Sequence, residues 1–296
     1  MRRTRARLHS RRLSTQEATA VDSILGQAPV VVSLTSYGSR IDSVHVTIES
    51  IARGSVRPSR IVLWLDSAAV FENLPEALER QKVRGLEIRL TNNYGPHTKY
   101  FPYVRSAVDL SLPLVTADDD IIYPRHWLSG LMDAYAQRPD AITGYWVRAM
   151  QVGDTGVPKG YVTWPSASDT LAHPRNVPLG VSGVIYPPRM LEQLRELDEA
   201  FVAIVPSTDD LWLHAVALRA GIEVRQLNST PVHFLTVPGS QEQSLAAANV
   251  AGTGNDHAVA RLYTRDDLLV VAGVAPQALL DPPHGRRAEH LRKKGR

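Results

Sequence analysis

Short apolar runs alternate with helix-like patterns along the first half of the chain. The runs are rich in valine, isoleucine and leucine, as buried strands are, and they lie at residues 29–34, 61–65, 86–90 and 114–115. The segment after the first run places Val44, Ile48 and Ile51 at helical spacing. Strands about 25–30 residues apart, with helices between them, indicate βαβ units around a mostly parallel sheet. The sequence therefore predicts an α/β fold in which helices flank such a sheet.

Basic residues are concentrated at the two ends of the chain. The formal net charge is +3, but residues 1–12 contain six arginines and no acid, and residues 286–296 contain six lysines or arginines and one glutamate. The part between these ends is therefore acidic overall. We expect a basic N-terminal arm (1–28), a single domain (29–265) and a C-terminal extension (266–296) that ends in a basic tail, with both tails disordered.

The charge distribution and the absence of cysteine limit the partners and the compartment. An acidic body argues against nucleic acid, which binds a basic folded surface. The basic tails permit weak, salt-sensitive contact with an anionic membrane, at about 1 kcal/mol per basic residue near the surface. The chain has no cysteine, which excludes disulfides and thiol nucleophiles, and no apolar signal segment follows its arginine-rich start. We expect a cytoplasmic protein, at most peripheral on the inner face of the membrane.

Three consecutive aspartates, Asp118, Asp119 and Asp120, follow the last of the four apolar runs. In an extended segment Asp118 and Asp120 point to one side and Asp119 to the other. Two carboxylates about 6 Å apart repel each other by roughly 3 kcal/mol at an effective dielectric near 20, so a positive group is expected between them. Mg²⁺ or Mn²⁺, held by one or two carboxylates and the phosphates of a substrate, fits this pattern. A solvated acidic turn is the alternative.

Other polar residues follow the ends of the predicted strands. In open α/β sheets ligands bind beyond the carboxyl ends of the strands. We therefore expect the loops at 35–40, 66, 92–99 and 118–120 to share one edge of the sheet. Lys99 would contact phosphate oxygens near a helix N-terminus, unless it is an ordinary exposed lysine.

A second acidic pair, Asp209 and Asp210, begins a predicted helix that Thr208 or Ser207 would cap. The helix dipole favours the ionised form of both acids, and an ionised carboxylate facing a cleft is what a general base requires. Asp210 is favoured as the base, because Asp209 is better placed to bond backbone N–H groups. Helix capping without any catalytic role is the alternative.

The second half of the chain offers weaker signals. Residues 150–178 are rich in proline, glycine and polar residues and indicate an irregular insertion. His233, for which a structural role is the simpler expectation, and the pair Asn255–Asp256 are candidates for metal or substrate contacts. The chain contains no Walker A loop, no G-x-G-x-x-G and no G-x-S-x-G. Their absence argues against kinases, dinucleotide oxidoreductases and α/β-hydrolases.

Several short segments occur together in an order that is typical of one enzyme family. They are SLTSYGSR (33–40), LWL (63–65), PHTKY (96–100), DDDIIYP (118–124), GVIYPP (183–188) and DDLW (209–212), followed by Gln241, Ser244, Leu245, Asn249 and Asn255–Asp256. With these segments the chain resembles bacterial GT-A glycosyltransferases of capsule and lipopolysaccharide synthesis, over roughly residues 30–262. The basic arm, the insertion and the basic tail fall outside the resemblance.

The resemblance implies a GT-A (Rossmann-like) fold and assigns roles to residues of this chain. Asp118 and Asp120 would form the Asp-x-Asp motif that meets the donor ribose and the metal-bound diphosphate. The candidate donor-binding residues are Thr35, Arg40, Asp66, Lys99, Asp118 and Asp119. Asp209 or Asp210 would lie on the acceptor side.

The residues and the resemblance together predict a glycosyltransferase that depends on Mn²⁺ or Mg²⁺. It would move a sugar from a nucleotide-sugar donor to a hydroxyl of a glycan or lipid-linked acceptor, and a carboxylate on the acceptor side favours inversion over retention. One alternative is a sugar-phosphate nucleotidyltransferase, which usually carries a glycine-rich basic loop after its first strand, whereas residues 35–40 are poor in glycine. The other is a non-catalytic protein that binds carbohydrate or a membrane surface.

Overall fold

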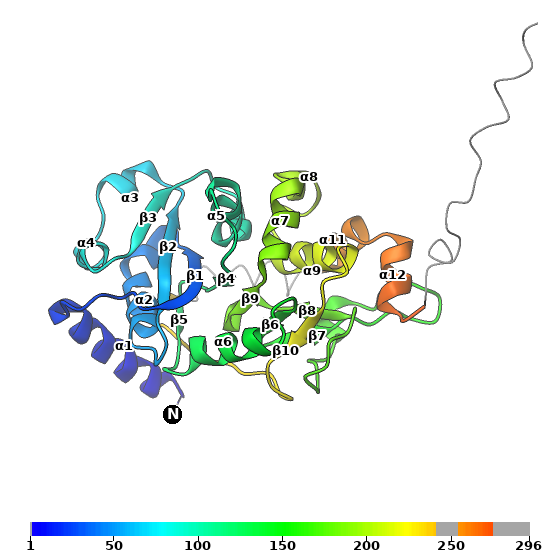
Figure 1. The fold of residues 1–296 in the computed structure, drawn as a ribbon, viewed down its shortest axis with the longest axis horizontal. Coiled ribbons are helices and arrows are strands. Elements are labelled where there is room, and N and C mark those ends of the chain that lie inside the picture. Colours follow the sequence, from blue (N-terminus) through cyan, green and yellow to red (C-terminus); the bar gives the residue numbers. More distant parts are fainter. Residues whose placement is uncertain (1, 241–253, 275–296) are drawn as a thin grey trace, which may run out of the picture.

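The computed structural model describes residues 2–240 and 254–274. At its centre is a seven-stranded sheet in the order β10-β6-β9-β4-β1-β2-β3 (Figure 1). Neighbouring strands are parallel, except that β9 runs antiparallel to β4 and β6. The strands are β1 (Ala28–Thr35), β2 (Pro58–Leu65), β3 (Glu87–Leu90), β4 (Leu114–Thr116), β6 (Ile142–Gly144), β9 (Val184–Tyr186) and β10 (Val224–Gln226). The prediction of a mostly parallel α/β sheet is confirmed.

The central strand β1 is buried on both faces, which explains its unbroken run of apolar residues. Val30, Val32 and Leu34 pack into the core on one face of the sheet, and Val31 packs into the core on the other. All four side chains are fully buried. Burial of each contributes about 1.5–3 kcal/mol, so this strand is anchored between two helix layers.

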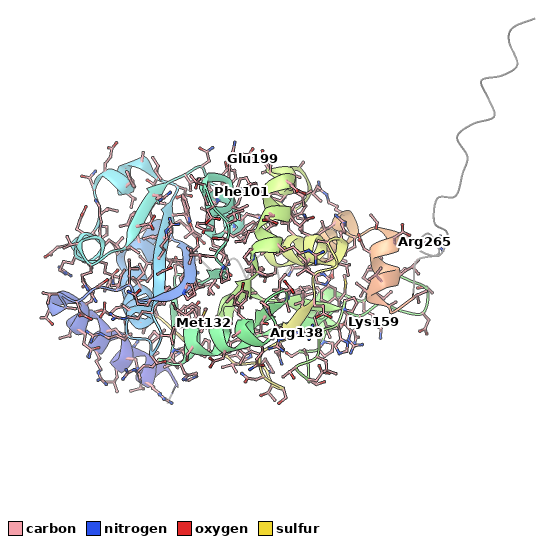
Figure 2. All side chains as sticks on the ribbon, viewed as in Figure 1. Phe101, Met132, Arg138, Lys159, Glu199 and Arg265 are labelled. Atoms are coloured by element: carbon pink, nitrogen blue, oxygen red, sulfur yellow. The ribbon has the colours of Figure 1, made fainter. Side chains whose placement is uncertain are left out.

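Helices cover both faces of the sheet, and side chains fill the space between the layers (Figure 2). The first face is covered by α2 (Val44–Ala52), α4 (Glu76–Val83) and α6 (Trp127–Gln137). The core on the opposite face contains residues of α5 (Phe101–Ser106), α7 (Pro188–Leu197), α8 (Ala200–Ile204), α9 (Asp209–Arg219), α11 (Gly254–Leu262) and α12 (Arg265–Val271), of which α11 and α12 pack against α9. A short helix, α3 (Ala68–Glu72), follows β2. The predicted flanking helices are therefore present on both sides.

The order of the strands reverses at β1. The chain runs from β1 through β2 to β3 in one direction and then crosses to β4 on the other side of β1. Ligands of open α/β sheets bind at such a switch point, beyond the carboxyl ends of the strands. After β4 the chain turns into β5 (Ile121–Ile122), which pairs with β11 (Leu235–Thr236). The acidic triplet lies in that turn.

The N-terminal arm is not disordered, contrary to expectation. Residues Arg2–Thr19 form α1, which packs against α2 and α4. The segment contains no glycine or proline, which permits a helix, and its contacts hold it in place: Ala6 and Leu13 are buried, and buried Glu17 accepts two hydrogen bonds from Arg80, at 2.7 and 3.0 Å. Neither α1 nor any other helix in the described ranges is long and apolar enough to cross a membrane. The division into arm, domain and extension stays a prediction, and the basic C-terminal tail lies outside the described residues.

Residues 150–178 are largely irregular, as expected. They follow the short strand β7 (Val147–Ala149) and end in β8 (Asn176–Pro178), which pairs with β7. A short turn at Gly180–Ser182 precedes β9. Gly183 follows this turn with φ of 95°, and a Cβ there would lie 2.5 Å from Nε1 of Trp127. A glycine is therefore required at this close approach.

Candidate active site

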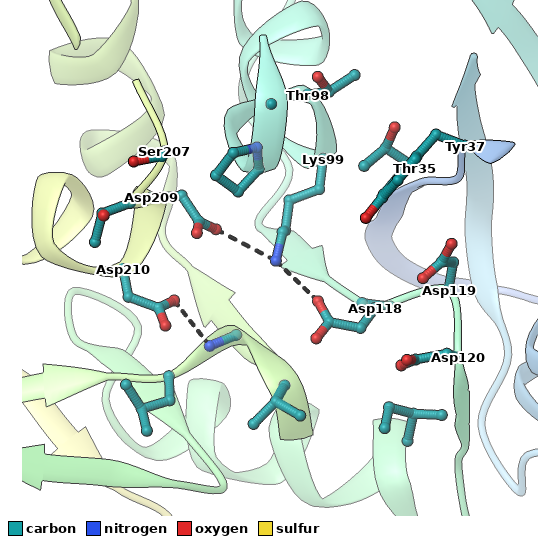
Figure 3. Close-up of a pocket in the computed structure, with 18 of the residues that line it drawn as sticks. Thr35, Tyr37, Thr98, Lys99, Asp118, Asp119, Asp120, Ser207, Asp209 and Asp210 are labelled. Carbon is teal, nitrogen blue, oxygen red and sulfur yellow. Dashed lines mark hydrogen bonds and ion pairs between the residues drawn. The ribbon is translucent and has the colours of Figure 1, made fainter. Parts of the chain in front are cut away.

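A cavity of about 570 Å³ opens at the carboxyl ends of β1, β2 and β4, at the switch point of the sheet (Figure 3). All the donor-binding, metal and catalytic candidates line it: Thr35, Arg40, Asp66, Lys99, Asp118, Asp119, Asp120, Asp209 and Asp210. The prediction that these loops share one edge of the sheet is therefore confirmed. The roles assigned to the individual residues stay predictions.

The acidic triplet forms a turn and not an extended segment. Asp118 points toward Lys99, with 2.8 Å between its Oδ1 and Nζ. Asp119 and Asp120 both approach Arg40, at 2.9 and 3.4 Å. The expected alternation, with Asp118 and Asp120 on one side, is wrong, because it holds only for an extended backbone. In the described residues Lys99 and Arg40 supply the positive charge that the sequence led us to expect.

Burial makes the ionised form of two of these carboxylates costly. It raises the pKa of Asp119, although hydrogen bonds from Ser36, at 2.7 Å, and Arg40 work against that rise. Burial and then the charge of Asp118 raise the pKa of Asp120 to about 7. A further positive charge in the cavity would stabilise the ionised forms.

Lys99 connects acidic groups from two different elements. Its Nζ lies 2.8 Å from Oδ1 of Asp118 and 3.3 Å from Oδ2 of Asp209, and its side chain is 12% exposed. Burial by itself would lower the pKa of Lys99, but the charges of Asp118, Asp209 and Asp210 outweigh it and raise the pKa well above its ordinary value. Lys99 is therefore charged, and it joins the turn after β4 to the start of α9 (Figure 3).

Asp209 and Asp210 occupy the first turn of α9, as predicted. Thr208 is the N-cap residue, without a side-chain capping bond. Asp210 Oδ1 accepts a hydrogen bond from the backbone N–H of Gly180, at 2.9 Å, whereas Asp209 contacts Lys99. This reverses the expectation that Asp209 is the acid tied to a backbone N–H. Burial and then the charge of Asp209 raise the pKa of Asp210 well above its ordinary value, so burial outweighs the helix dipole that was expected to favour ionisation.

The cavity is lined by more acidic than basic groups. Six aspartates face three cations, Arg40, Lys99 and Arg148. No three His, Asp or Glu side chains within the described ranges form a ready-made metal cage. Mg²⁺ is usually held by one or two carboxylates together with substrate phosphates. Asp118 is one-quarter exposed, and its Oδ2 has no partner among the residues that the structure describes. Hard carboxylate oxygens such as this one suit Mg²⁺ or Mn²⁺, and the assignment of Asp118 and Asp120 as the residues that would hold the ion stays a prediction.

The structure also brings residues to the cavity that the sequence did not indicate. Trp146 and Arg148 flank the start of β7, and Tyr161 comes from the irregular insertion. The carbonyl oxygen of Trp146 accepts a hydrogen bond from the Leu179 N–H, at 2.9 Å, and the next N–H, that of Gly180, donates to Asp210, so this wall lies near the start of α9. They were missed because aromatic and basic residues in an irregular stretch carry no periodic signal, and only the pairing of β7 with β8 places them.

The candidate residues near the C-terminal end of the chain, Asn255, Asp256 and His233, differ in where they lie. Asn255 lines the cavity and lies 3.5 Å from the hydroxyl of Thr208. Asp256 accepts a hydrogen bond from the backbone N–H of Tyr161, at 2.7 Å, and so holds the insertion in place. His233 lies outside the cavity, where its ring packs edge-on against Trp146. The structural role expected for His233 stays a prediction.

The sequence matches no protein-family model and no curated protein. Solved structures do match by fold. The mannosyltransferase PcManGT from Pyrobaculum calidifontis, in complex with GDP-Man and Mn²⁺, aligns with a TM-score of 0.50 and 14% identity, over 94% of this chain and 72% of that one. A 4-diphosphocytidyl-2C-methyl-D-erythritol synthase from Anaerococcus prevotii aligns with a TM-score of 0.48 and 13% identity, over 76% and 98%. TarS from S. aureus aligns with a TM-score of 0.43 and 12% identity, over 68% and 58%. At such identities a likeness shows the fold alone, and the chain has a Rossmann-like α/β fold of the GT-A type.

Proposed function

We propose that the protein is a metal-dependent glycosyltransferase that moves a sugar from a nucleotide-sugar donor to a hydroxyl of a glycan or lipid-linked acceptor, with inversion. One observation carries this proposal. A single cavity at the switch point of the sheet holds two acidic groups from different elements, with Lys99 between them. Asp118 comes from the turn after β4, and Asp210 comes from the start of α9. The fold shared with a mannosyltransferase that binds GDP-Man and Mn²⁺ supports the proposal.

The donor diphosphate would lie beside the turn after β4. Lys99, whose pKa the neighbouring aspartates raise against the effect of burial, would contact the phosphate oxygens as a cation. Asp118 and Asp120 would hold Mn²⁺ or Mg²⁺, which when bound neutralises the charge of the departing diphosphate. The residues that would lie near the nucleotide are Thr35, Arg40 and Asp66.

The acceptor hydroxyl would lie against Asp210. The N–H of Gly180 occupies Oδ1 of Asp210, and Oδ2 has no partner among the described residues. In its ionised form, a carboxylate whose pKa is raised is a stronger proton acceptor. In the proposed step Oδ2 takes the hydroxyl proton while the hydroxyl oxygen bonds to the anomeric carbon. The bond from that carbon to the diphosphate breaks, its electron pair leaves with the diphosphate, and attack from the opposite side inverts the centre.

The order of motifs in the sequence favours a role in the synthesis of a bacterial surface polysaccharide. Such an enzyme would work in the cytoplasm, at the inner face of the membrane. α1 supports this placement, because its arginines are exposed: Arg3, Arg5, Arg7, Arg11 and Arg12. Leu8 on the same helix is 63% exposed. Anionic lipid headgroups attract such a surface.

A donor panel tests the reaction. The full chain is incubated with UDP-, GDP- and CMP-linked sugars and Mn²⁺, and release of the nucleotide is followed with and without a mixture of glycan acceptors. We expect one donor to be hydrolysed slowly and transferred faster, and Asp118→Asn to abolish both. Pyrophosphate formed from a sugar phosphate and a nucleoside triphosphate would instead identify a nucleotidyltransferase. A protein that forms neither product, and whose Asp120→Asn variant binds nucleotide as the wild type does, would be a binding protein.

The metal is tested by binding, without any need for turnover. Isothermal titration with UDP and GDP should show at least tenfold weaker binding in EDTA than in Mn²⁺, and a similar loss in Asp118→Asn or Asp120→Asn. Asp133→Asn, an exposed aspartate on α6, makes the same change of charge outside the cavity and is the control. Equal affinity in Mn²⁺ and EDTA would contradict the metal assignment.

A further inference from the structure

Among the described residues that line the cavity, Arg148 is the one cation that no carboxylate neutralises. Arg40 and Lys99 each pair with two aspartates. Arg148 is half-buried and forms no ion pair with any described residue. A half-buried guanidinium in a cavity is expected to have an anionic partner, because removing a charge from water is costly unless it is paired.

The Arg148 side chain is held in a fixed position. Its backbone lies in β7, where it pairs with Val177 of β8. Its Nη1 donates a hydrogen bond to the carbonyl oxygen of Tyr161, at 3.0 Å, and its guanidinium carbon lies 5.0 Å from the centre of the Tyr161 ring. A guanidinium has five N–H donors, and the described residues engage one of them. The remaining donors are available to a ligand.

The surroundings place Arg148 at the end of the cavity where the acceptor would lie. The residue two positions before it connects to Asp210, the proposed base: the carbonyl oxygen of Trp146 accepts a hydrogen bond from the Leu179 N–H, at 2.9 Å, and the adjacent Gly180 N–H donates to Asp210, at 2.9 Å. Trp146 lines the same wall, and its Nε1 donates to Ser166 Oγ at 3.1 Å, which fixes the indole. An immobilised indole offers a large apolar face with few rotatable bonds. A cation and an aromatic face beside the proposed base therefore form one surface.

We propose that the acceptor carries an anionic group, a carboxylate or a phosphate, which Arg148 binds while the sugar ring lies against Trp146. This inference rests on the proposed glycosyltransferase function and adds the chemical class of the acceptor. The planar guanidinium matches either group with two parallel hydrogen bonds. Six aspartates line the cavity, so an anionic acceptor is repelled unless a cation meets it at its own end. A neutral acceptor would leave the half-buried Arg148 without an anionic partner among the described residues.

Matched sugars test the inference by binding. Methyl glycosides of several hexoses are titrated into the full chain with UDP or GDP and Mn²⁺, each sugar as the neutral form, the 6-carboxylate and the 6-phosphate, and binding is read by saturation-transfer NMR. We expect one anionic form to bind about 10- to 100-fold more tightly than its neutral counterpart, as charge-assisted hydrogen bonds allow. The carboxylate and phosphate series show which group is the natural one.

Three variants identify the residue responsible. Arg148→Gln keeps a donor for Tyr161 but removes the charge, and it should erase the preference for the anionic form. Arg148→Lys keeps the charge but cannot form two parallel hydrogen bonds, and it should keep part of the preference. Arg175→Gln removes one charge from an exposed site on the same insertion, and it should leave the preference intact. Where transfer is observed, KM for the anionic acceptor should rise in Arg148→Gln with little change in kcat.

The outcomes separate the two proposals. If no sugar binds better in an anionic form, or if Arg148→Gln keeps the preference, the inference is wrong even when transfer to neutral acceptors is observed. If Arg148→Gln weakens nucleotide binding and not acceptor binding, Arg148 belongs to the donor site and the inference is again wrong. If nucleotide sugars neither bind nor react, the glycosyltransferase proposal itself fails, whatever the sugars do.

Discussion

Asp209 and Asp210 are neighbours in sequence, but their contacts differ, and the difference predicts separate roles. Asp210→Asn keeps the bond to the Gly180 N–H and loses the proton acceptor. We expect kcat to fall by roughly 10²- to 10⁴-fold, the usual contribution of a general base, with donor affinity within a few-fold of wild type. Asp209 raises the pKa of Asp210. In Asp209→Asn the Asp210 carboxyl therefore loses its proton at lower pH, and the acidic limb of the kcat–pH profile should move to lower pH.

Single-turnover transfer and nucleotide titration of both variants, across a range of pH, check this prediction. The exposed aspartate of α6, replaced in Asp133→Asn, serves as the control for a change of charge alone. Wild-type transfer rates in both cavity variants would mean that the base lies elsewhere, and a retaining mechanism would then be the better interpretation.

At the scale of residues, the sequence indicated which carboxylates meet but not what each one contacts. Their positions after predicted strands were enough to bring Asp118 and Asp120 to one edge. The turn that points Asp119 and Asp120 to the same arginine leads into β5, whose pairing with the distant β11 no local pattern encodes. Asp210 bonds Gly180, which lies thirty residues earlier in the sequence, and such a contact is visible only once β9 is placed.

At the scale of elements, α1 shows that a basic segment can be ordered by a few buried contacts. Three of its exposed arginines can be replaced while Ala6, Leu13 and Glu17 keep the helix docked. We expect the combined change of Arg3, Arg5 and Arg7 to Gln to weaken binding to anionic liposomes by roughly 100-fold, since each basic residue contributes about 1 kcal/mol. Turnover on a soluble acceptor should be retained.

Sedimentation with liposomes of anionic and of neutral lipid, at low and high salt, measures the effect of α1. The combined change of Arg175, Arg189 and Arg265 to Gln is the matched control, because these arginines are exposed on other elements. If the α1 variant and the control variant sediment equally with anionic liposomes, the arginines of α1 do not bind the membrane.

The centre of α9 carries a histidine that links stability to pH. His214 is buried; its Nε2–H donates to the Pro174 carbonyl at 2.8 Å, and its Nδ1 accepts from the Tyr263 hydroxyl at 2.6 Å. Burial lowers the pKa of His214 to about 4, below the value of about 6.5 in an unfolded chain. Between these values the unfolded chain binds a proton that the folded chain does not. The free energy of unfolding should therefore fall as the pH drops from 6.5 toward 4, by up to about 3 kcal/mol from this residue.

Urea denaturation between pH 7 and pH 4.5 measures this slope. His214→Gln should be less stable than wild type at pH 7 but should lose less stability as the pH falls. His97 is also buried, and burial lowers its pKa to about 4. Part of the pH dependence of the unfolding free energy therefore remains in the variant. Parallel pH curves for the variant and the wild type would contradict the assignment.

At the scale of the whole molecule, the first half of the fold follows from local pattern and the second half does not. The runs around β1, β2 and β3 are continuous, and each is followed by the next helix in sequence, so their order could be predicted. β9 runs antiparallel between β4 and β6, which interrupts the alternation of strand and helix. Its three residues carry too little periodicity to indicate a direction or a neighbour, so long-range pairing decides their place.

The cavity links these two halves, and this predicts how a ligand acts on global stability. Its lining runs from Thr35 to Asn255, and the adjoining sheet separates two cores. A nucleoside diphosphate bound with Mn²⁺ at 100 times its dissociation constant should stabilise the fold by about 2.7 kcal/mol. For a chain of this size that corresponds to a rise in Tm of roughly 5 °C.

Because both cores contribute to the cavity, the rise should affect one cooperative transition. Scanning calorimetry with UDP or GDP, in Mn²⁺ and in EDTA, measures it, and Asp118→Asn should lose most of the shift. Two transitions, of which the ligand moves one, would mean that the halves unfold separately and that the cavity does not couple them.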